Sequence, residues 1–359
     1  MQSKVESFIR TRGRDADFET LALEVFAHQY RSCRVYRSFC QRHGRGPENV
    51  EREAEIPALP AEAFKQDLGL SQPRPFVFRS SGTTRGTAER SGHCLSNLET
   101  YRLSAMTHFA DMVLADRPGP MSVLIMGPSR GTHPDSSLGQ MFTWCADEFG
   151  KDDASLAFDS RGKVDIHSAL SWLQDAAAGA QPVLILAVSS ALTTLFKALR
   201  AQNRPLRLPA DSRIVDTGGG KGEVTVFSPH GMLKAAWRYL HVPAYACLNQ
   251  YGMTEMLSQF YDDALLTRVQ GGLGKRVKLG PPWVRTTVVE PAALRPVEGR
   301  RRGILRHFDL ANWDTVSCLQ TLDVACRRGR GFDLYGRMPM ADSRGCSQLM
   351  AGFDTRLPL

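Results

Sequence analysis

Long apolar runs, paired cysteines and the Cys and His spacings that bind metals are all missing from this chain of 359 residues. No segment approaches the roughly 18 consecutive apolar residues that a membrane-spanning helix requires. The first residues, Met1 to Arg14, are polar and lack the apolar core of a signal peptide. We therefore expect a protein without a membrane span, located in the cytoplasm.

Cysteines are present, eight in number, but none of them forms a CxxC pair. In a chain without a secretion signal they are expected to be reduced thiols. All but one fit the role of small core or surface residues. The exception is Cys346, close to the C-terminus, whose role is considered after the motifs.

The charge balance is basic, with a formal net charge of +8 and an isoelectric point near 9.2. The densest basic runs are Arg300-Arg301-Arg302 and Arg327-Arg328-Gly329-Arg330. Such runs attract anionic partners, namely nucleic acid, an acidic protein or a nucleotide. Neither run lies on a helical pattern with interleaved aromatic residues. Solvated turns are therefore the favoured interpretation, and nucleic-acid binding ranks last among the possible functions.

The middle of the chain alternates short apolar runs with helix-like segments, an order typical of βα units and a largely parallel sheet. Nearer the N-terminus, apolar residues recur at helical spacing from Phe18 to Phe39, which predicts a helix there. The predicted strands are Val123–Gly127, Pro182–Val188 and Arg213–Asp216, and the helix-like segments lie near Leu192–Leu199 and Gly231–Leu240.

After Val284 the pattern changes to short strands separated by turns, which predicts a β-rich, more antiparallel closing section. These strands are Thr286–Val289, Gly303–Phe308, Val316–Leu322, Gly331–Tyr335 and Ser347–Met350. The hydrophobic share of 42% and the charged share of 23% are ordinary for a globular protein with a sizeable core. The predicted class is α/β with mainly parallel sheets followed by this β-rich section.

A run of hydroxyls and glycines, Arg79-Ser80-Ser81-Gly82-Thr83-Thr84-Arg85-Gly86-Thr87, directly follows the apolar residues Phe76 to Phe78. Such a loop suits phosphate, because its backbone N–H groups can point at anionic oxygens without obstruction from bulky side chains. It is not a Walker A loop, since GxxxxGK[ST] cannot be placed there. A Ser/Gly/Thr-rich surface turn remains the alternative.

Two further segments carry candidate ligand-binding residues. Gly218-Gly219-Gly220-Lys221 lies at the carboxyl end of a predicted strand, where open α/β sheets place ligands. A flexible hairpin tip is the alternative there. Gln250-Tyr251-Gly252-Met253-Thr254-Glu255 sets a carboxylate beside a hydroxyl, and Glu255 could bind magnesium through oxygen. Taken alone, an exposed glutamate at a helix start is the favoured interpretation of Glu255.

These pieces, followed by Thr321-Leu322-Asp323 and Tyr335-Gly336-Arg337, occur in an order that resembles the core motifs of adenylate-forming enzymes. The resemblance implies that the first loop holds the ATP phosphates and that Glu255 serves Mg²⁺. It also implies that the Gly-rich turn and the Tyr-Gly-x-Thr-Glu segment enclose adenine and the acyl-adenylate, that Asp323 takes the ribose hydroxyls and that Arg337 marks the hinge into a lid. The nucleotide-binding residues implied are Ser80, Ser81, Gly82, Thr83, Thr84, Gly219, Gly220, Tyr251, Gly252, Thr254, Asp323 and Arg337.

The resemblance narrows to the acyl-protein synthetase family of the LuxE type and spans nearly the whole chain. It is carried by Ile56–Lys65, Ser136–Met141, Gly218–Gly222 and Arg344-Gly345-Cys346-Ser347. It implies that an acid is activated as acyl-AMP, passed to a cysteine near the C-terminus and delivered to a partner reductase, acyltransferase or carrier protein. The matching cysteine is Cys346. The implied domains are an adenylate-forming domain over residues 1–336 and a vestigial lid over residues 337–359.

Cys346 also has chemical features that suit a nucleophile. A nearby cation such as Arg344 lowers a thiol pKa, and Gly345 leaves the sulfur approachable. Adenylation turns a poor electrophile into a mixed anhydride that a thiolate attacks, which divides one hard step into two easier ones. From spacing alone, a buried small residue in a terminal strand is the alternative.

Three features depart from the general pattern of the superfamily. Arg85 stands where the phosphate loop normally has glycine, no lysine follows that loop, and no full lid follows to supply the usual adenylation lysine. The last two departures fit the acyl-protein synthetase type. Lys221 is our hypothesis for the substitute cation that stabilises the phosphates.

Two other functions stay open from the sequence. One is an acyl- or aryl-CoA or carrier-protein ligase in which Cys346 is structural, and the other is a catalytically inactive nucleotide-binding scaffold. The identity of the acid is not readable, although residues near Met126–Met141 and Cys247–Gln250 are expected to line its pocket.

Overall fold

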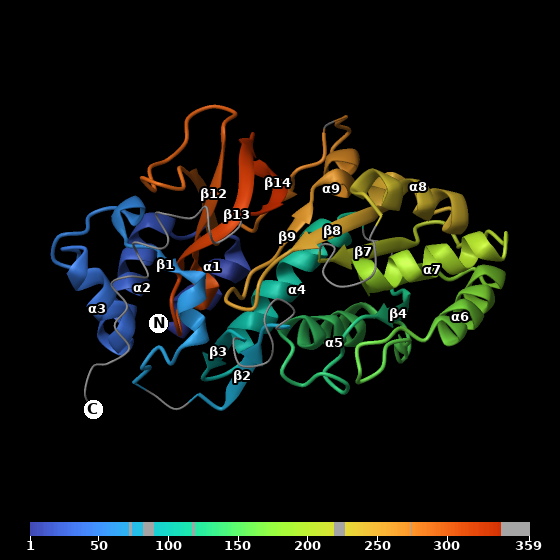
Figure 1. Cartoon of the computed structure of the whole chain (residues 1–359), viewed down its shortest axis with the longest axis horizontal. Helices are drawn as coiled ribbons and strands as arrows, with labels where there is room; N and C mark the ends of the chain where they lie inside the picture. The colour runs from blue at the N-terminus through green and yellow to red at the C-terminus, as the bar shows by residue number, and fades with distance from the viewer. Residues whose placement is uncertain (72–73, 82–89, 117–118, 219–226, 274, 339–359) are drawn as a thin grey trace.

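The computed structural model describes residues 1–71, 74–81, 90–116, 119–218, 227–273 and 275–338 (Figure 1). The helices are α1 (Gln2–Thr11), α2 (Phe18–Ser32), α3 (Arg34–Arg42), α4 (Glu99–Val113), α5 (Ser137–Phe149), α6 (Ile166–Ala178), α7 (Ser189–Ala201), α8 (Pro229–Leu240) and α9 (Ala264–Val269). Short 3₁₀ helices include η2 (Ala61–Lys65) and η5 (Leu310–Asn312).

The strands are β1 (Leu59–Pro60), β2 (Phe76–Arg79), β3 (Gly92–Leu95), β4 (Ser122–Met126), β5 (Ser155–Leu156), β6 (Val183–Val188), β7 (Arg213–Thr217), β8 (Cys247–Tyr251), β9 (Phe260–Asp262), β10 (Lys278–Leu279), β11 (Val284–Val289), β12 (Arg302–Asp309), β13 (Cys318–Arg328) and β14 (Gly331–Arg337). All except β2 and β3 belong to one large sheet in the order β11-β12-β13-β14-β10-β9-β8-β7-β6-β4-β5, with β1 beside β13.

The two halves of this sheet differ in strand direction. From β5 through β4, β6 and β7 to β8 every pairing is parallel, whereas along the order from β8 to β11 the pairings are antiparallel. The short strand β1 is parallel to β13. The predicted α/β fold, with parallel strands first and a β-rich section after them, is confirmed. The predicted lid over residues 337–359 lies, apart from its first two residues, outside the described part.

The parallel half is a sandwich of helix, sheet and helix, with α6, α7 and α8 on one face (Figure 1). Side chains of a strand alternate between the two faces of the sheet. In β6, Leu184 and Leu186 therefore pack with α4 and α5, while Ile185 packs with the helices of the other face. Burial on both faces explains why this strand is apolar throughout rather than alternating.

The helix predicted from Phe18 to Phe39 is divided in two at Cys33, whose backbone is extended with φ −113° and ψ 103°. The segment of Leu68 and Gly69 runs beside the break. The N–H of Arg34 donates to Gly69 O at 3.2 Å, and the N–H of Val35 donates to Leu68 O at 3.3 Å. These long-range hydrogen bonds take the place of the helical ones at this point, and apolar periodicity cannot reveal them.

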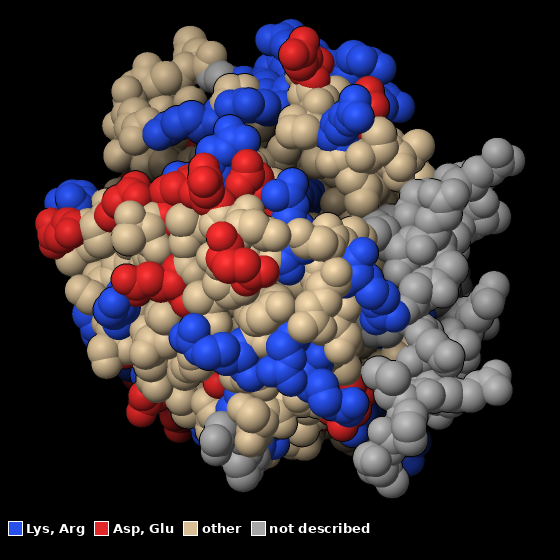
Figure 2. Space-filling view, turned by 90° about the vertical axis from the view of Figure 1, so that its left-hand side faces the viewer, with Lys and Arg blue, Asp and Glu red and all other residues tan. Residues whose placement is uncertain are grey.

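Charged side chains are unevenly distributed over the surface of the molecule. Figure 2 shows acidic and basic side chains gathered in separate areas on the face that carries the N-terminal helices.

Within the described ranges, no helix is both long and apolar enough to cross a bilayer. Six of the cysteines there are buried and Cys94 is partly exposed, which agrees with the predicted role of small core or surface residues.

Candidate active site

Tyr251 lies in β8, where the parallel and antiparallel halves of the sheet join, and it contacts Asp323 of β13. Tyr251 ends β8, and its hydroxyl donates to Asp323 Oδ2 at 2.7 Å. Burial raises the pKa of the Tyr251 phenol well above its ordinary range, so the phenol acts as the donor. The Tyr251 ring packs against Phe260 and Phe332, with centroids 5.6 and 5.8 Å apart, and these contacts hold it in one orientation.

Arg337 lies directly opposite Asp323 in the β13–β14 hairpin. Its Nη2 contacts Oε1 of Glu62 at 2.9 Å, and Glu62 is a buried residue of η2. Burial raises the pKa of Glu255, and the positive charge of Arg337 partly opposes that rise. One arginine therefore connects the hairpin to two buried carboxylates that lie far apart in the sequence.

Glu255 is buried, with 8% of its surface exposed, so it is not the exposed helix-start glutamate that was the alternative. Burial raises the pKa of this carboxyl, whereas a hydrogen bond from Ser91 and the charge of Arg337 act in the opposite direction. A carboxylate with these neighbours, aimed away from bulk solvent, is a suitable oxygen ligand for a hard cation.

Ser91 brings two of the predicted motifs together. Its N–H donates to Ser80 Oγ at 2.9 Å, and the N–H of Ser80 donates to Ser91 O at 3.0 Å. Arg90 adds hydrogen bonds to Ser80 O and, at 2.9 Å, to Asp135. These hydrogen bonds hold the two ends of the hydroxyl-rich loop together beside Glu255. Ser81 is exposed, and Gly82, Thr83, Thr84 and Arg85 lie outside the described residues.

The segment of Gly252, Thr254 and Glu255 is held by residues that no sequence motif indicated. His93 Nδ1 lies 2.8 Å from Thr254 O, and Asn312 Nδ2 donates to Glu255 O at 2.7 Å. Full burial lowers the pKa of His93 to about 4, so the ring is neutral at physiological pH. Ser91 and His93, which come a few residues after the loop, are the candidates that proximity in the sequence could have suggested.

Asp309 holds Ser258, three residues after this segment. It accepts hydrogen bonds from the N–H of Ser258 at 3.0 Å and from the Ser258 hydroxyl at 2.7 Å. Burial raises the pKa of Asp309 to about 6 despite these bonds. Within the predicted motif, Gly252 is restricted by its surroundings, since a Cβ there would lie 2.7 Å from Nε2 of Gln250.

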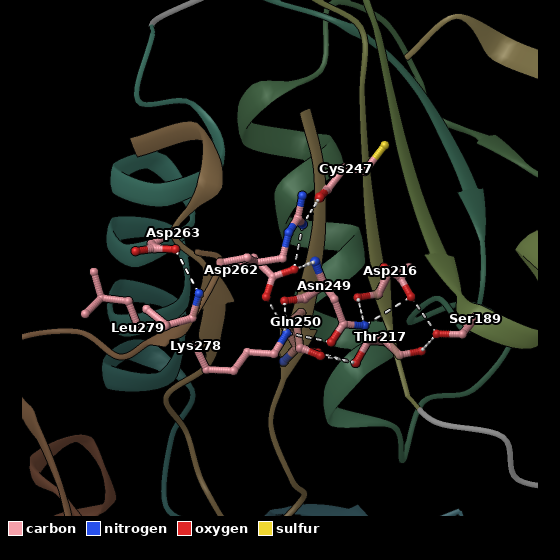
Figure 3. A network of polar contacts seen from close by, with 12 residues as sticks. Ser189, Asp216, Thr217, Cys247, Asn249, Gln250, Asp262, Asp263, Lys278 and Leu279 are labelled. Carbon is pink, nitrogen blue, oxygen red and sulfur yellow. Dashed lines mark hydrogen bonds and ion pairs between the residues drawn. The ribbon is translucent and has the colours of Figure 1, made fainter. Parts of the chain in front are cut away.

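A second polar network lies at the carboxyl ends of β7 and β8 (Figure 3). Ser189 Oγ is 2.6 Å from Asp216 Oδ2 and 2.9 Å from Gly218 O, and Asn249 Nδ2 donates to the same Asp216 oxygen at 3.1 Å. Gly218 has φ +94°, a conformation that favours glycine. The network fixes the first residue of the Gly-rich turn, whereas Gly219, Gly220 and Lys221 lie outside the described residues.

Lys278 connects this network to β9 and β10. Its Nζ donates to Asn249 Oδ1 at 2.6 Å and contacts Asp262 Oδ1 at 3.0 Å, and Arg276 contacts the other Asp262 oxygen at 2.8 Å. Burial lowers the pKa of Lys278 and raises that of Asp216. The buried charges compensate one another, as buried ionisable groups require.

The chemistry of these side chains fits a nucleotide and one divalent cation. No group of three or more His, Cys, Asp and Glu side chains in the described ranges could enclose a metal by itself. Mg²⁺ typically needs only one or two carboxylates when phosphates and water complete its shell, and Glu255 can supply one. Asp323 has a second oxygen that can accept from a ligand hydroxyl. Cys346 lies outside the described residues.

Comparison with known proteins gives two similarities in sequence. A family model described as "Acyl-protein synthetase, LuxE" matches residues 12–353. A long-chain-fatty-acid–luciferin-component ligase of Photorhabdus luminescens is 35% identical over 66 residues, which are 18% of this chain and 56% of that protein. The match therefore spans little more than half the length of this curated relative.

Solved structures with a similar fold are adenylate-forming enzymes. A 2-hydroxyisobutyryl-CoA ligase in an open conformation, in complex with 2-HIB-AMP and CoA, aligns with a TM-score of 0.62 and 14% identity over 91% of this chain and 75% of its own. A long-chain-fatty-acid-CoA ligase from Archaeoglobus fulgidus aligns with a TM-score of 0.52 and 13% identity over 76% of this chain and 53% of its own. At these identities the similarity establishes the fold alone.

Proposed function

This chain belongs to the acyl-protein synthetase (LuxE) family, as its motifs predicted, and we propose that it is an ATP-dependent ligase that activates a carboxylic acid. The carboxylate attacks the α-phosphorus of ATP and releases pyrophosphate, which leaves an acyl-AMP. A fatty acid is the first choice of substrate, because the curated relative is named as a long-chain-fatty-acid ligase.

The observation that carries the proposal is the convergence of the motifs in space. Ser80, Glu255, Tyr251, Asp323 and Arg337 come from separate parts of the chain and are joined through hydrogen bonds and charges. A surface turn or an isolated glutamate would not require such an arrangement. The same convergence disfavours the interpretation of the motifs as unrelated solvated loops.

Each residue then has a distinct task. The free oxygen of Asp323 accepts from the ribose hydroxyls, while the Tyr251 hydroxyl holds the carboxylate in place from its other oxygen. Glu255 and the backbone N–H groups of the Ser80–Thr84 loop face the phosphates, with Gly219, Gly220, Gly252 and Thr254 enclosing the adenylate and Lys221 as the additional cation. Mg²⁺ held by Glu255 would neutralise charge on the phosphates as pyrophosphate leaves.

The activated acyl group is then transferred to a thiol, for which we propose Cys346. The thiolate attacks the acyl carbonyl carbon, a C–S bond forms, the C–O bond to AMP breaks, and AMP leaves with the electron pair. The thioester would serve as the donor to an acyl-accepting partner protein. Arg337 at the end of β14 is the proposed hinge for the residues that carry Cys346.

Intact-protein mass spectrometry after incubation with ATP, Mg²⁺ and a panel of fatty and aromatic acids tests this function. We expect an acyl adduct that hydroxylamine removes. The Cys346→Ser variant should lose the adduct while retaining acid-dependent pyrophosphate exchange, because adenylation precedes the transfer. Cys94→Ser is the matched control, since Cys94 is the one partly exposed cysteine among those described.

An adduct that survives in Cys346→Ser and disappears in Cys94→Ser would remove Cys346 from the mechanism. Absence of an adduct, together with acid-dependent AMP release on addition of CoA or a carrier protein, would instead establish a ligase with an external thiol acceptor. Absence of acid-dependent pyrophosphate exchange would refute acid activation altogether.

A further inference from the structure

The two densest basic runs of the sequence meet in one groove of the folded chain. Arg300 comes from the first run, Arg328 and Arg330 come from the second, and Lys275 joins them from the segment before β10. The groove has a cavity volume of about 450 Å³. Asp263, Val277, Leu279 and Gly329 complete its lining. Lys and Arg side chains gather at the upper end of Figure 2, which is also the end where Figure 1 places the β12–β14 hairpins.

Positive charge in this groove is largely uncompensated. Arg328 is paired with Asp333, whose Oδ2 accepts from Arg328 Nε at 2.7 Å. Within the described part of the chain, Lys275, Arg300 and Arg330 make no ion pair. A concave surface lined by positively charged side chains concentrates the electrostatic field and attracts an anionic partner.

The only acidic side chain among the described lining residues, Asp263, is committed to the fold. Its Oδ1 accepts from the Val277 N–H at 3.0 Å, and its Oδ2 accepts from the Thr267 hydroxyl at 3.3 Å. Its carboxylate thus stabilises the turn into β10 and the start of α9. It does not form an ion pair with the arginines across the groove.

Apolar side chains in the groove lining and in the segment before Lys275 favour a protein as the partner. Leu273 is fully exposed, and Val269 is half exposed at the end of α9. Val277 and Leu279 add an aliphatic floor. Recognition of single-stranded nucleic acid relies on aromatic side chains on which bases stack, and the described lining residues of this groove include none. An acidic segment with apolar side chains can pair with the Lys and Arg side chains and also cover the exposed leucine.

The groove also lies on the hairpin that carries the candidate active site. Arg328 is five positions beyond Asp323 in β13, a distance of roughly 17 Å along an extended strand. Arg330 and Gly329 border a second, smaller cavity of about 120 Å³, which is also lined by Phe260 and Phe332. These two phenylalanines are the ones that pack against Tyr251. A protein held in the groove would therefore stand close to the proposed reaction.

We propose that this groove docks an acidic, partly apolar segment of the protein that accepts the acyl group. The identity of the partner as the acyl acceptor rests on the proposed function, whereas the binding itself does not. Docking requires neither ATP nor acid, so it can be measured separately from adenylation.

Fluorescence polarisation with a fluorescein-labelled peptide that alternates glutamate and leucine tests the proposal. At low ionic strength we expect saturable binding that the charge-reversed variant Lys275→Glu/Arg300→Glu/Arg330→Glu weakens about tenfold or more. The matched control is Lys197→Glu/Arg200→Glu/Arg204→Glu, a cluster of exposed cations on and just after α7. This control makes the same change in net charge away from the groove and should bind within about twofold of the wild type.

Additional measurements distinguish a failure of the docking proposal from a failure of the proposed function. Acid-dependent pyrophosphate exchange in both variants reports an intact fold, and its absence in all forms would refute the proposed function while leaving the docking result standing. Equal loss of peptide binding in both variants, or no binding to the wild type, would overturn the docking proposal. An oligothymidylate that binds the groove more tightly than the peptide would also overturn it.

Discussion

Tyr251 and Asp323 are 72 positions apart in the sequence and share one hydrogen bond. Their residue types were identified in advance from motif order, but their contact depends on the fold bringing together β8 and β13, which three strands separate in the sheet order. Ser91, His93, Asp309 and Asn312 were not identified, because serine, histidine, aspartate and asparagine acquire a role only through the partner that the fold supplies. At the residue scale, a motif predicts the side chains that face a ligand better than it predicts the residues that hold those side chains in place.

Asp323→Ala is predicted to weaken ATP binding by removing a charged acceptor of hydrogen bonds. We expect the KM for ATP in acid-dependent pyrophosphate exchange to rise about tenfold to a hundredfold with a smaller change in kcat. Tyr251→Phe removes only the hydroxyl that orients this carboxylate, so its effect should be smaller, at about threefold to tenfold. An unchanged KM for ATP in Asp323→Ala would contradict the assignment of Asp323 to the ribose.

At the scale of elements, the parallel strands were predictable because their apolar runs are buried on both faces. Val123–Gly127, Pro182–Val188 and Arg213–Asp216 match β4, β6 and β7 to within one residue at each end. The division between α2 and α3 was not predictable, because hydrogen bonds to the carbonyl oxygens of Leu68 and Gly69 decide it. The buried ion network around Lys278 was also invisible, since its members come from β7 through β10.

Asp262→Asn is predicted to destabilise the protein strongly, because it leaves the buried ammonium of Lys278 without its carboxylate partner. We expect the free energy of unfolding in urea to fall by about 3 to 5 kcal/mol. Asp333→Asn is the matched control, because Asp333 pairs with Arg328 at a more exposed position, with 20% and 29% of their side chains accessible. Its cost should be much smaller, because solvent screens the exposed pair. Equal costs for the two variants would show that the network does not stabilise the fold.

At the scale of the whole molecule, the N-terminal helices and the antiparallel strands share one core. Phe18 of α2 packs edge-to-face on Phe308 of β12, with ring centroids 6.0 Å apart. Gln29 donates to Asn312 O at 2.9 Å and accepts from the Ser317 N–H at 3.1 Å. Residues near the N-terminus therefore pack against residues near the end of the described part. Asn312 in turn donates a hydrogen bond to the backbone oxygen of Glu255.

Gln29→Ala is predicted to lower the free energy of unfolding by about 2 to 3 kcal/mol, because it leaves buried backbone groups without partners. Far-UV circular dichroism and tryptophan fluorescence should report the same single transition, since both halves of this core must open together. Gln41→Ala on the exposed side of α3 should be nearly neutral. Separate transitions for the two signals would show that the N-terminal helices unfold independently.

The sequence by itself determined the α/β class, the order of the motifs and the family, because these depend on residue type and on spacing along the chain. Only the tertiary structure decided which residues support Glu255, where the helix near Cys33 divides and whether the two basic runs meet. Each of these depends on contacts between segments that are distant in the sequence, and neither periodicity nor motif spacing records which distant segments become neighbours. Arg300 and Arg330 show this most plainly, since as separate runs they were assigned to solvated turns and in the fold they line one groove.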